Sequence, residues 1–195
     1  MRMIPTRFLL PFCLLAAVAC SSDSSKKDPV AEARFENEKR IGDADITKKQ
    51  ERDAEFMVDA ASDGLLEVEL GKLAQQKAAT PATKEFGQHM AAQHAQMNAA
   101  LQALARQKGI SVPAALGQAQ QQTYTELTAL TGLEFDKKYL EMMVDDHAND
   151  VERFDDMSED AYDGDIRGFA AKYLPTLKEH LDMARKTQDQ VQEMK

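Results

Sequence analysis

The sequence is poor in residues that cross-link or interrupt a chain, since its 195 residues contain two cysteines, six prolines and no tryptophan. Both cysteines, Cys13 and Cys20, lie near the N-terminus, so the rest of the chain can form no internal disulfide and offers no cysteine nucleophile. A Gly-rich phosphate loop is missing as well. Runs of β-branched residues and sustained apolar-polar alternation are also absent, which excludes a large sheet. These absences leave a helical protein stabilised by packing.

The longest apolar run is short and lies at the N-terminus. Residues 8–18 are apolar and follow the basic residues Arg2 and Arg7, which is the pattern of an export signal. Because this run is too short to span a membrane permanently, we predict a signal peptide over residues 1–19.

The residues before Cys20 resemble a bacterial lipobox, in which the cysteine is lipidated and becomes the new N-terminus. An ordinary cleaved secretory signal is the alternative. By the same resemblance, Ser21 after the cysteine favours the outer membrane over the inner one. We therefore expect an envelope protein held to the outer membrane by a lipid on Cys20 and facing the periplasm.

Positive charge is scarce, with 24 basic residues against 33 acidic ones and a formal net charge of −9. Loss of residues 1–19 would remove two arginines and leave a formal charge of −11. Such an acidic chain is a poor candidate for binding nucleic acid or anionic headgroups. We expect no nucleic-acid partner.

The chain divides into three predicted parts: the signal peptide, a lipidated cysteine with a charged tether over residues 20–52, and a helical domain over residues 53–195. Within the tether, Asp28 before Pro29 has the pattern of a short helix start. In the domain, apolar residues recur at steps of three and four. The predicted helices span residues 53–79, 81–108, 114–130, 133–157 and 165–192.

Local signals mark several helix ends. Thr80 precedes a proline at one start, Gly109 is a good stop, and Thr131 with Glu134 has the form of a capping box. Pro175 should kink the last helix. Four long helices, with a weakly amphipathic helical segment between the second and third, predict an all-α, ferritin-like four-helix bundle with a long crossover.

Three of the four histidines, His94, His147 and His180, fall about 50° from the centre of the apolar stripe of three different helices on a wheel with 100° per residue. Asp146 has the same offset on the other side of its stripe. His89 lies at the border of its stripe and should be solvated. A buried imidazole needs a polar partner, water or an ion.

Two glutamates of the first long helix are candidates to join these histidines, but they lie 200° apart and cannot both face inward. Its leucines place Glu69 near the middle of the apolar face and Glu67 outside. Glu69 with the three histidines, and Asp146 beside them, would suit a single transition-metal ion such as zinc. Ordinary packing at the stripe edge is the alternative for each histidine.

Other metals fit less well. The step from Met90 to His94 recurs from Met143 to His147 and would suit Cu(I), although methionines at helical spacing usually fill cores. A ferritin-type di-iron site needs Glu-x-x-His motifs, and the chain has none. We therefore reject that site.

Several segments resemble the bacterial family called domain of unknown function 4142. They are residues 67–74, 86–90, 135–136, 143–147, 174–177 and 180–181. The resemblance implies a ferritin-like fold in exported or outer-membrane-attached proteins and no established activity. In that family the second and third long helices each tend to carry an Asp-His pair. Here Asp146 and His147 keep it, whereas Gln93 precedes His94.

Together these patterns predict a non-enzymatic envelope lipoprotein that binds an envelope protein or has a structural role, with no established cofactor. The alternative is a metal-binding or metal-dependent stress-response protein that uses the histidine cluster.

Overall fold

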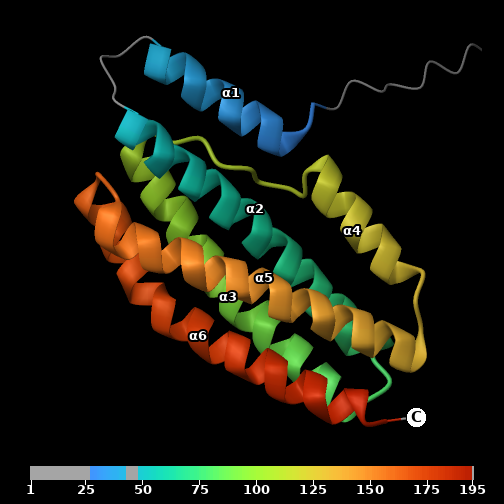
Figure 1. Ribbon diagram of the computed structural model, residues 1–195. Coiled ribbons are helices and arrows are strands. Elements are labelled where there is room, and N and C mark those ends of the chain that lie inside the picture. Colours follow the sequence, from blue (N-terminus) through green and yellow to red (C-terminus); the bar gives the residue numbers. More distant parts are fainter. Residues whose placement is uncertain (1–26, 43–47, 195) are drawn as a thin grey trace, which may run out of the picture.

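Six α-helices form the part of the chain that the structure describes, residues 27–42 and 48–194 of a computed structural model (Figure 1). They are α1 Pro29–Gly42, α2 Lys48–Lys77, α3 Pro81–Lys108, α4 Gln118–Thr128, α5 Gly132–Asp160 and α6 Gly164–Gln192. No strand occurs in these two ranges, which confirms the all-α prediction. Helix α2 begins five residues before the expected start, and α4 is shorter than the predicted segment 114–130.

The long helices form two hairpins, α2 with α3 and α5 with α6. The hairpins meet through contacts of α2 with α5 and of α3 with α6. Helix α4 belongs to the connection from α3 to α5 and packs on α2, so the connection crosses one side of the bundle (Figure 1). This arrangement fits the predicted ferritin-like bundle with a helical crossover.

The predicted caps of α3 form, whereas that of α5 does not. The Thr80 hydroxyl accepts a hydrogen bond from the Thr83 N–H at 3.2 Å, and Gly109 ends the helix with a φ of 64°. Thr131 makes no side-chain capping bond, so the capping-box prediction is wrong. The chain instead turns through Gly132, whose φ of 64° suits a residue without a Cβ.

Two buried aspartates tie the hairpins together. Asp53 of α2 accepts hydrogen bonds from the N–H groups of Tyr162 and Asp163, at 3.0 and 2.7 Å, in the loop between α5 and α6. Asp136 of α5 does the same for Ala79 and Thr80, at 2.8 and 2.9 Å, in the loop between α2 and α3. Each hairpin therefore fixes the loop of the other, which sets the register of the four helices.

Apolar side chains form two core clusters at the two ends of the bundle. One contains Phe56, Met97, Phe154 and Phe169 among others, and the other contains Leu70, Met90, Tyr139 and Met143 among others. On each of α3, α5 and α6, a stretch of residues that belongs to neither cluster lies between the members of one cluster and those of the other. His94, His147 and His180 lie in these stretches. The histidines therefore occupy a polar layer at mid-length of the bundle.

Helices α2 and α3 approach closely through small residues. A Cβ added to Gly71 would lie 2.5 Å from the Gly87 carbonyl oxygen, and one added to Gly87 would lie 2.6 Å from the Ala74 Cβ. Neither distance is compatible with a normal contact, so both glycines are needed for this spacing.

Residues 29–42, expected within a charged tether, form α1 and dock on the bundle. Asp28 caps the helix by accepting bonds from Val30 and Ala31, as its position before Pro29 predicts. The Asn37 side chain exchanges two hydrogen bonds with the backbone of Ser111. Residues 1–19, predicted as a signal peptide, and Cys20, predicted as the lipidated residue, lie outside the described residues.

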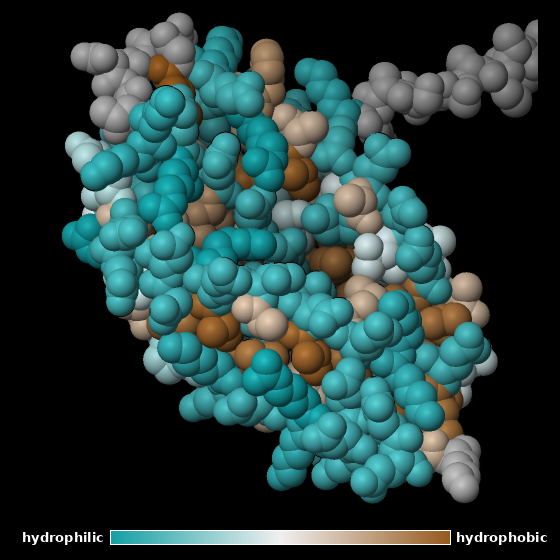
Figure 2. All heavy atoms as spheres, viewed as in Figure 1, coloured by the Kyte–Doolittle hydropathy of each residue, from teal (hydrophilic) through white to brown (hydrophobic). Residues whose placement is uncertain are grey.

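The face shown in Figure 2 is mostly hydrophilic, and apolar residues show mainly in the seams between helices. Of the helices described, none combines the length and the apolar character required to cross a membrane.

Candidate metal centre

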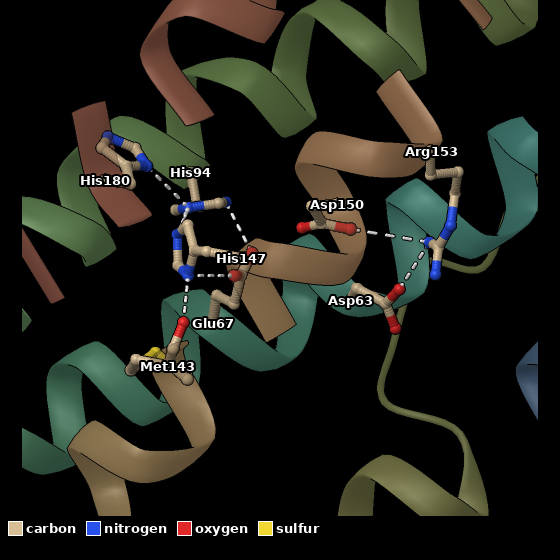
Figure 3. A network of polar contacts seen from close by, with 8 residues as sticks. All are labelled: Asp63, Glu67, His94, Met143, His147, Asp150, Arg153 and His180. Carbon is tan, nitrogen blue, oxygen red and sulfur yellow. Dashed lines mark hydrogen bonds and ion pairs between the residues drawn. The ribbon is translucent and has the colours of Figure 1, made fainter. Parts of the chain in front are cut away.

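Three imidazoles from three helices meet in the middle of the bundle (Figure 3). His94 Nε2 lies 3.2 Å from His147 Nε2 and 3.2 Å from His180 Nδ1. One nitrogen from each ring lies within 4.8 Å of the others. The structure thus brings together the three histidines that the sequence predicted.

All three rings are removed from solvent. The exposed fractions of His94 and His147 are 0 %, and that of His180 is 2 %. The helical wheel places them at the stripe edge, but an imidazole is long enough to reach inward from that position. They are core residues, in contrast to His89, which is exposed as expected.

A carboxyl group and a backbone carbonyl lie against the other nitrogens of two of these rings. The Glu67 Oε2 atom lies 2.7 Å from His94 Nδ1, and its Oε1 atom lies 3.5 Å from His147 Nδ1. The backbone carbonyl of Met143 lies 2.8 Å from the same His147 nitrogen. A carbonyl oxygen only accepts, so the neutral His147 carries its proton on Nδ1 and turns an unprotonated Nε2 toward the other two rings.

The inward-facing glutamate is Glu67, and the prediction that Glu69 faces the interior is wrong. Glu67 is 1 % exposed, whereas Glu69 has 41 % of its side chain exposed and pairs with Lys72 at 2.7 Å. The buried face of α2 at this level contains small residues as well as Leu66 and Leu70. Glu67 shares it with Ala60, Gly64, Gly71 and Ala74, at steps of three and four residues.

Burial keeps the centre uncharged in the absence of an ion. It lowers the pKa of His94 to about 3 and that of His180 to about 2, and it raises the pKa of the Glu67 carboxyl. The 2.7 Å contact of Glu67 with His94 is therefore not an ion pair. Its angles are also unfavourable, since both Glu67 oxygens and His94 Nδ1 are buried without a hydrogen-bond partner among the described residues.

An acidic group with one arginine lies beside the histidines on α2 and α5. Arg153 Nη1 lies 2.8 Å from Asp63 Oδ2 and 3.6 Å from Asp150 Oδ1 (Figure 3). Burial raises the pKa of Asp150, and burial followed by the charge of Asp63 raises the pKa of Asp146 to about 6. Asp146, a predicted ligand, is half-buried and is not among the three groups whose ligand atoms converge.

Glu67, Asp63, Asp150 and Arg153 were not predicted from the sequence. Two signals could have indicated them. Asp63 and Glu67 are four residues apart, as are Asp146 and Asp150, so each pair shares one helix face. On α2 that face is also the small-residue face.

The two contacts of His94 Nε2 have the spacing expected around a tetrahedral metal ion. Two imidazole nitrogens bound at about 2.0 Å to such an ion would lie roughly 3.3 Å apart. Both contacts of His94 Nε2 are 3.2 Å. The buried group of His94, His147 and His180 could therefore hold one ion and would leave one coordination position free.

The methionines that suggested copper have another role here. Met90 and Met143 are fully buried in the apolar cluster at one end of the bundle. Met143 reaches the centre through its backbone carbonyl. Their burial is that of ordinary core residues.

The fold and the centre define the protein as a helical bundle with three buried histidines at mid-length. The chain belongs to the family described as Domain of unknown function (DUF4142), whose model matches residues 40–187. This confirms the family resemblance noted in the sequence. Comparison with curated proteins and with solved structures gave no match.

Proposed function

We propose that the protein binds one divalent transition-metal ion, of the zinc type, through His94, His147 and His180. The observation that carries this proposal is the pair of 3.2 Å contacts that His94 Nε2 makes with a nitrogen of each of the other two rings inside the bundle.

Hydrogen bonds between the three rings cannot account for both short contacts of His94 Nε2. The Met143 carbonyl leaves His147 Nε2 without a proton, so the contact with His94 needs a proton on His94. A single N–H on His94 Nε2 can point well at only one of its two neighbours. A cation at the centre would accept the lone pairs of all three nitrogens at once, which favours a metal ion over a hydrogen-bonded histidine cluster.

Glu67 would supply the support that metal-binding histidines need once an ion binds and its carboxyl group ionises. In such sites the second ring nitrogen is held by a carboxylate or a carbonyl, which fixes the ring and increases its basicity. Glu67 lies against His94 and His147 on the nitrogens that do not face the centre. Its negative charge, once ionised, would also offset the charge of a buried ion.

The role we propose is metal binding in the cell envelope without catalysis. The lipobox-like sequence at Cys20 supports an exported, membrane-attached protein. The depth of the centre supports retention of the ion rather than turnover of a substrate, since two of the three rings have no exposed surface.

Metal analysis of protein purified without a histidine tag tests this proposal. We expect about one equivalent of Zn²⁺ per chain and a thermal stabilisation of about 2.7 kcal/mol at a free ion concentration one hundred times the Kd. His147→Ala should abolish both, and the exposed Asn149→Ala on the same helix should preserve both. Equal behaviour of the two variants, or no binding of Zn²⁺, Fe²⁺ or Cu⁺ by the unchanged protein, would reject the proposal.

A further inference from the structure

The fourth histidine, His89 of α3, lies next to the buried centre although it is exposed. Its ring centroid is 5.6 Å from that of His180, and the two rings are nearly perpendicular. His89 makes no hydrogen bond or ion pair with any residue that the structure describes. Its ring nitrogens are therefore available to an ion arriving from solvent.

The histidines form a continuous series from the surface inward. Ring centroids are 5.6 Å apart from His89 to His180, 5.1 Å from His180 to His94, and 5.3 Å from His94 to His147. Exposure falls in the same order, from an exposed His89 to a fully buried His94 and His147. Each step is short enough for one ion to be shared briefly between neighbouring rings, since metal–nitrogen bonds are about 2 Å long.

The acidic side of the centre is a less suitable entrance. There the Arg153 guanidinium already lies among the carboxylates, 2.8 Å from Asp63 and 3.6 Å from Asp150. A divalent ion entering on that side would have to pass this fixed positive charge.

We infer that His89 is the loading residue of the centre, an exposed imidazole that captures a divalent transition-metal ion and transfers it through His180 to the three buried rings. The inference rests on the proposed metal-binding function. Each transfer exchanges one nitrogen or water ligand for another, and the ion keeps its charge. Because His89 is a transient ligand, it should change the rate of binding and leave the equilibrium affinity unchanged.

Stopped-flow mixing of metal-free protein with Co²⁺, whose visible absorption reports tetrahedral coordination, tests this inference. His89→Gln should slow both association and dissociation by roughly tenfold, which corresponds to about 1.4 kcal/mol of barrier. The neighbouring exposed variant Gln88→Ala should retain the rates of the unchanged protein. An equilibrium titration of each variant should give the same affinity.

Two outcomes would overturn the inference. Unchanged rates in His89→Gln would show that ions enter by another route. A loss of affinity in this variant would make His89 a permanent ligand or a structural residue. Both results presuppose that the unchanged protein binds Co²⁺. If it shows no cobalt absorption at all, the proposed metal-binding function has failed, and not only the role of His89.

Discussion

Glu67 Oε2 lies 2.7 Å from Nδ1 of His94, while Nε2 of the same ring faces His147 and His180. One side of the imidazole is thus set against a carboxyl group and the other is turned toward two further nitrogens. The three histidines would therefore bind the ion, and Glu67 would orient them from outside. Substitution of Glu67 tests this division of roles.

Glu67→Gln should weaken zinc binding without removing a ligand. The amide keeps the size of the side chain but cannot carry the negative charge that supports His94 and His147. Loss of such a supporting group typically reduces metal affinity by about 10- to 100-fold. Competition titrations against a chelator of known affinity would measure the change.

Glu69→Gln is the matched control, because Glu69 lies two residues away on the same helix and has 41 % of its side chain exposed. It should leave zinc affinity unchanged. If both variants bind zinc as the unchanged protein does, Glu67 does not support the site. If Glu69→Gln is the weaker binder, the assignment of the two glutamates is reversed.

The close approach of α2 and α3 predicts a large effect from one methyl group. In Gly71→Ala the new Cβ would meet the Gly87 carbonyl at 2.5 Å, so the helices must separate. Overpacking of this kind costs about 1–3 kcal/mol. It should also weaken metal binding, because these helices carry Glu67 and His94. Denaturant unfolding and zinc titration would measure the two effects.

Gly168→Ala provides the control for this substitution. A Cβ at Gly168, within α6, would have no neighbour among the described residues within 4 Å. Alanine is the better helix former by about 0.5–1 kcal/mol, so this variant should be slightly more stable. Equal destabilisation by the two substitutions would contradict the importance of the α2–α3 spacing.

Much of the fold could be predicted from the sequence because it depends on local signals. Thr80 before Pro81, Gly109 and the spacing of apolar residues indicated α3 closely, and the other long helices were placed to within a few residues. The failure at Thr131 has a local cause, the left-handed turn at Gly132. Docking of α1 depends on the partner Ser111, 74 positions from Asn37, which no local pattern reveals.

Part of the candidate site was also predictable from local sequence patterns. The apolar stripes identified the three histidines, since a ring at the edge of a stripe can reach the core. Glu67 was missed because the stripe was defined by leucines, whereas the face against α3 is defined by Gly71 and other small residues. Arg153 and Asp150 were missed because their burial depends on contacts between helices.

The two loop-binding aspartates should be important for stability. Asp136→Ala would remove the acceptor of two N–H groups, that of the exposed Ala79 and that of the buried Thr80. The loss at the buried Thr80 N–H costs about 1–3 kcal/mol. Chemical denaturation should therefore show a clear loss of stability. Asp156→Ala, which removes only an exposed pair with Arg52, should cost less than about 1 kcal/mol. The account of these loops fails if the two variants are equally stable.

The cap of α1 predicts a stability change that depends on pH. Hydrogen bonds from the N–H groups of Gln118 and Ala31 lower the pKa of Asp28 below its usual 3.8. The stabilisation is therefore complete above that pH and is lost as the pH falls through the lowered pKa. Asp28→Ala should cost about 1 kcal/mol at pH 7, which is typical of a lost helix N-cap, and less near pH 2. Hydrogen exchange of α1 amides at the two pH values would measure the difference.

X-ray absorption at the zinc edge of tag-free protein tests the central claim most directly. We predict one bound ion per chain with three imidazole nitrogens at about 2.0–2.1 Å, and loss of this signature in His94→Ala. A spectrum of hydrated or oxygen-bound zinc, or an unchanged spectrum in the variant, would contradict a metal centre at His94, His147 and His180.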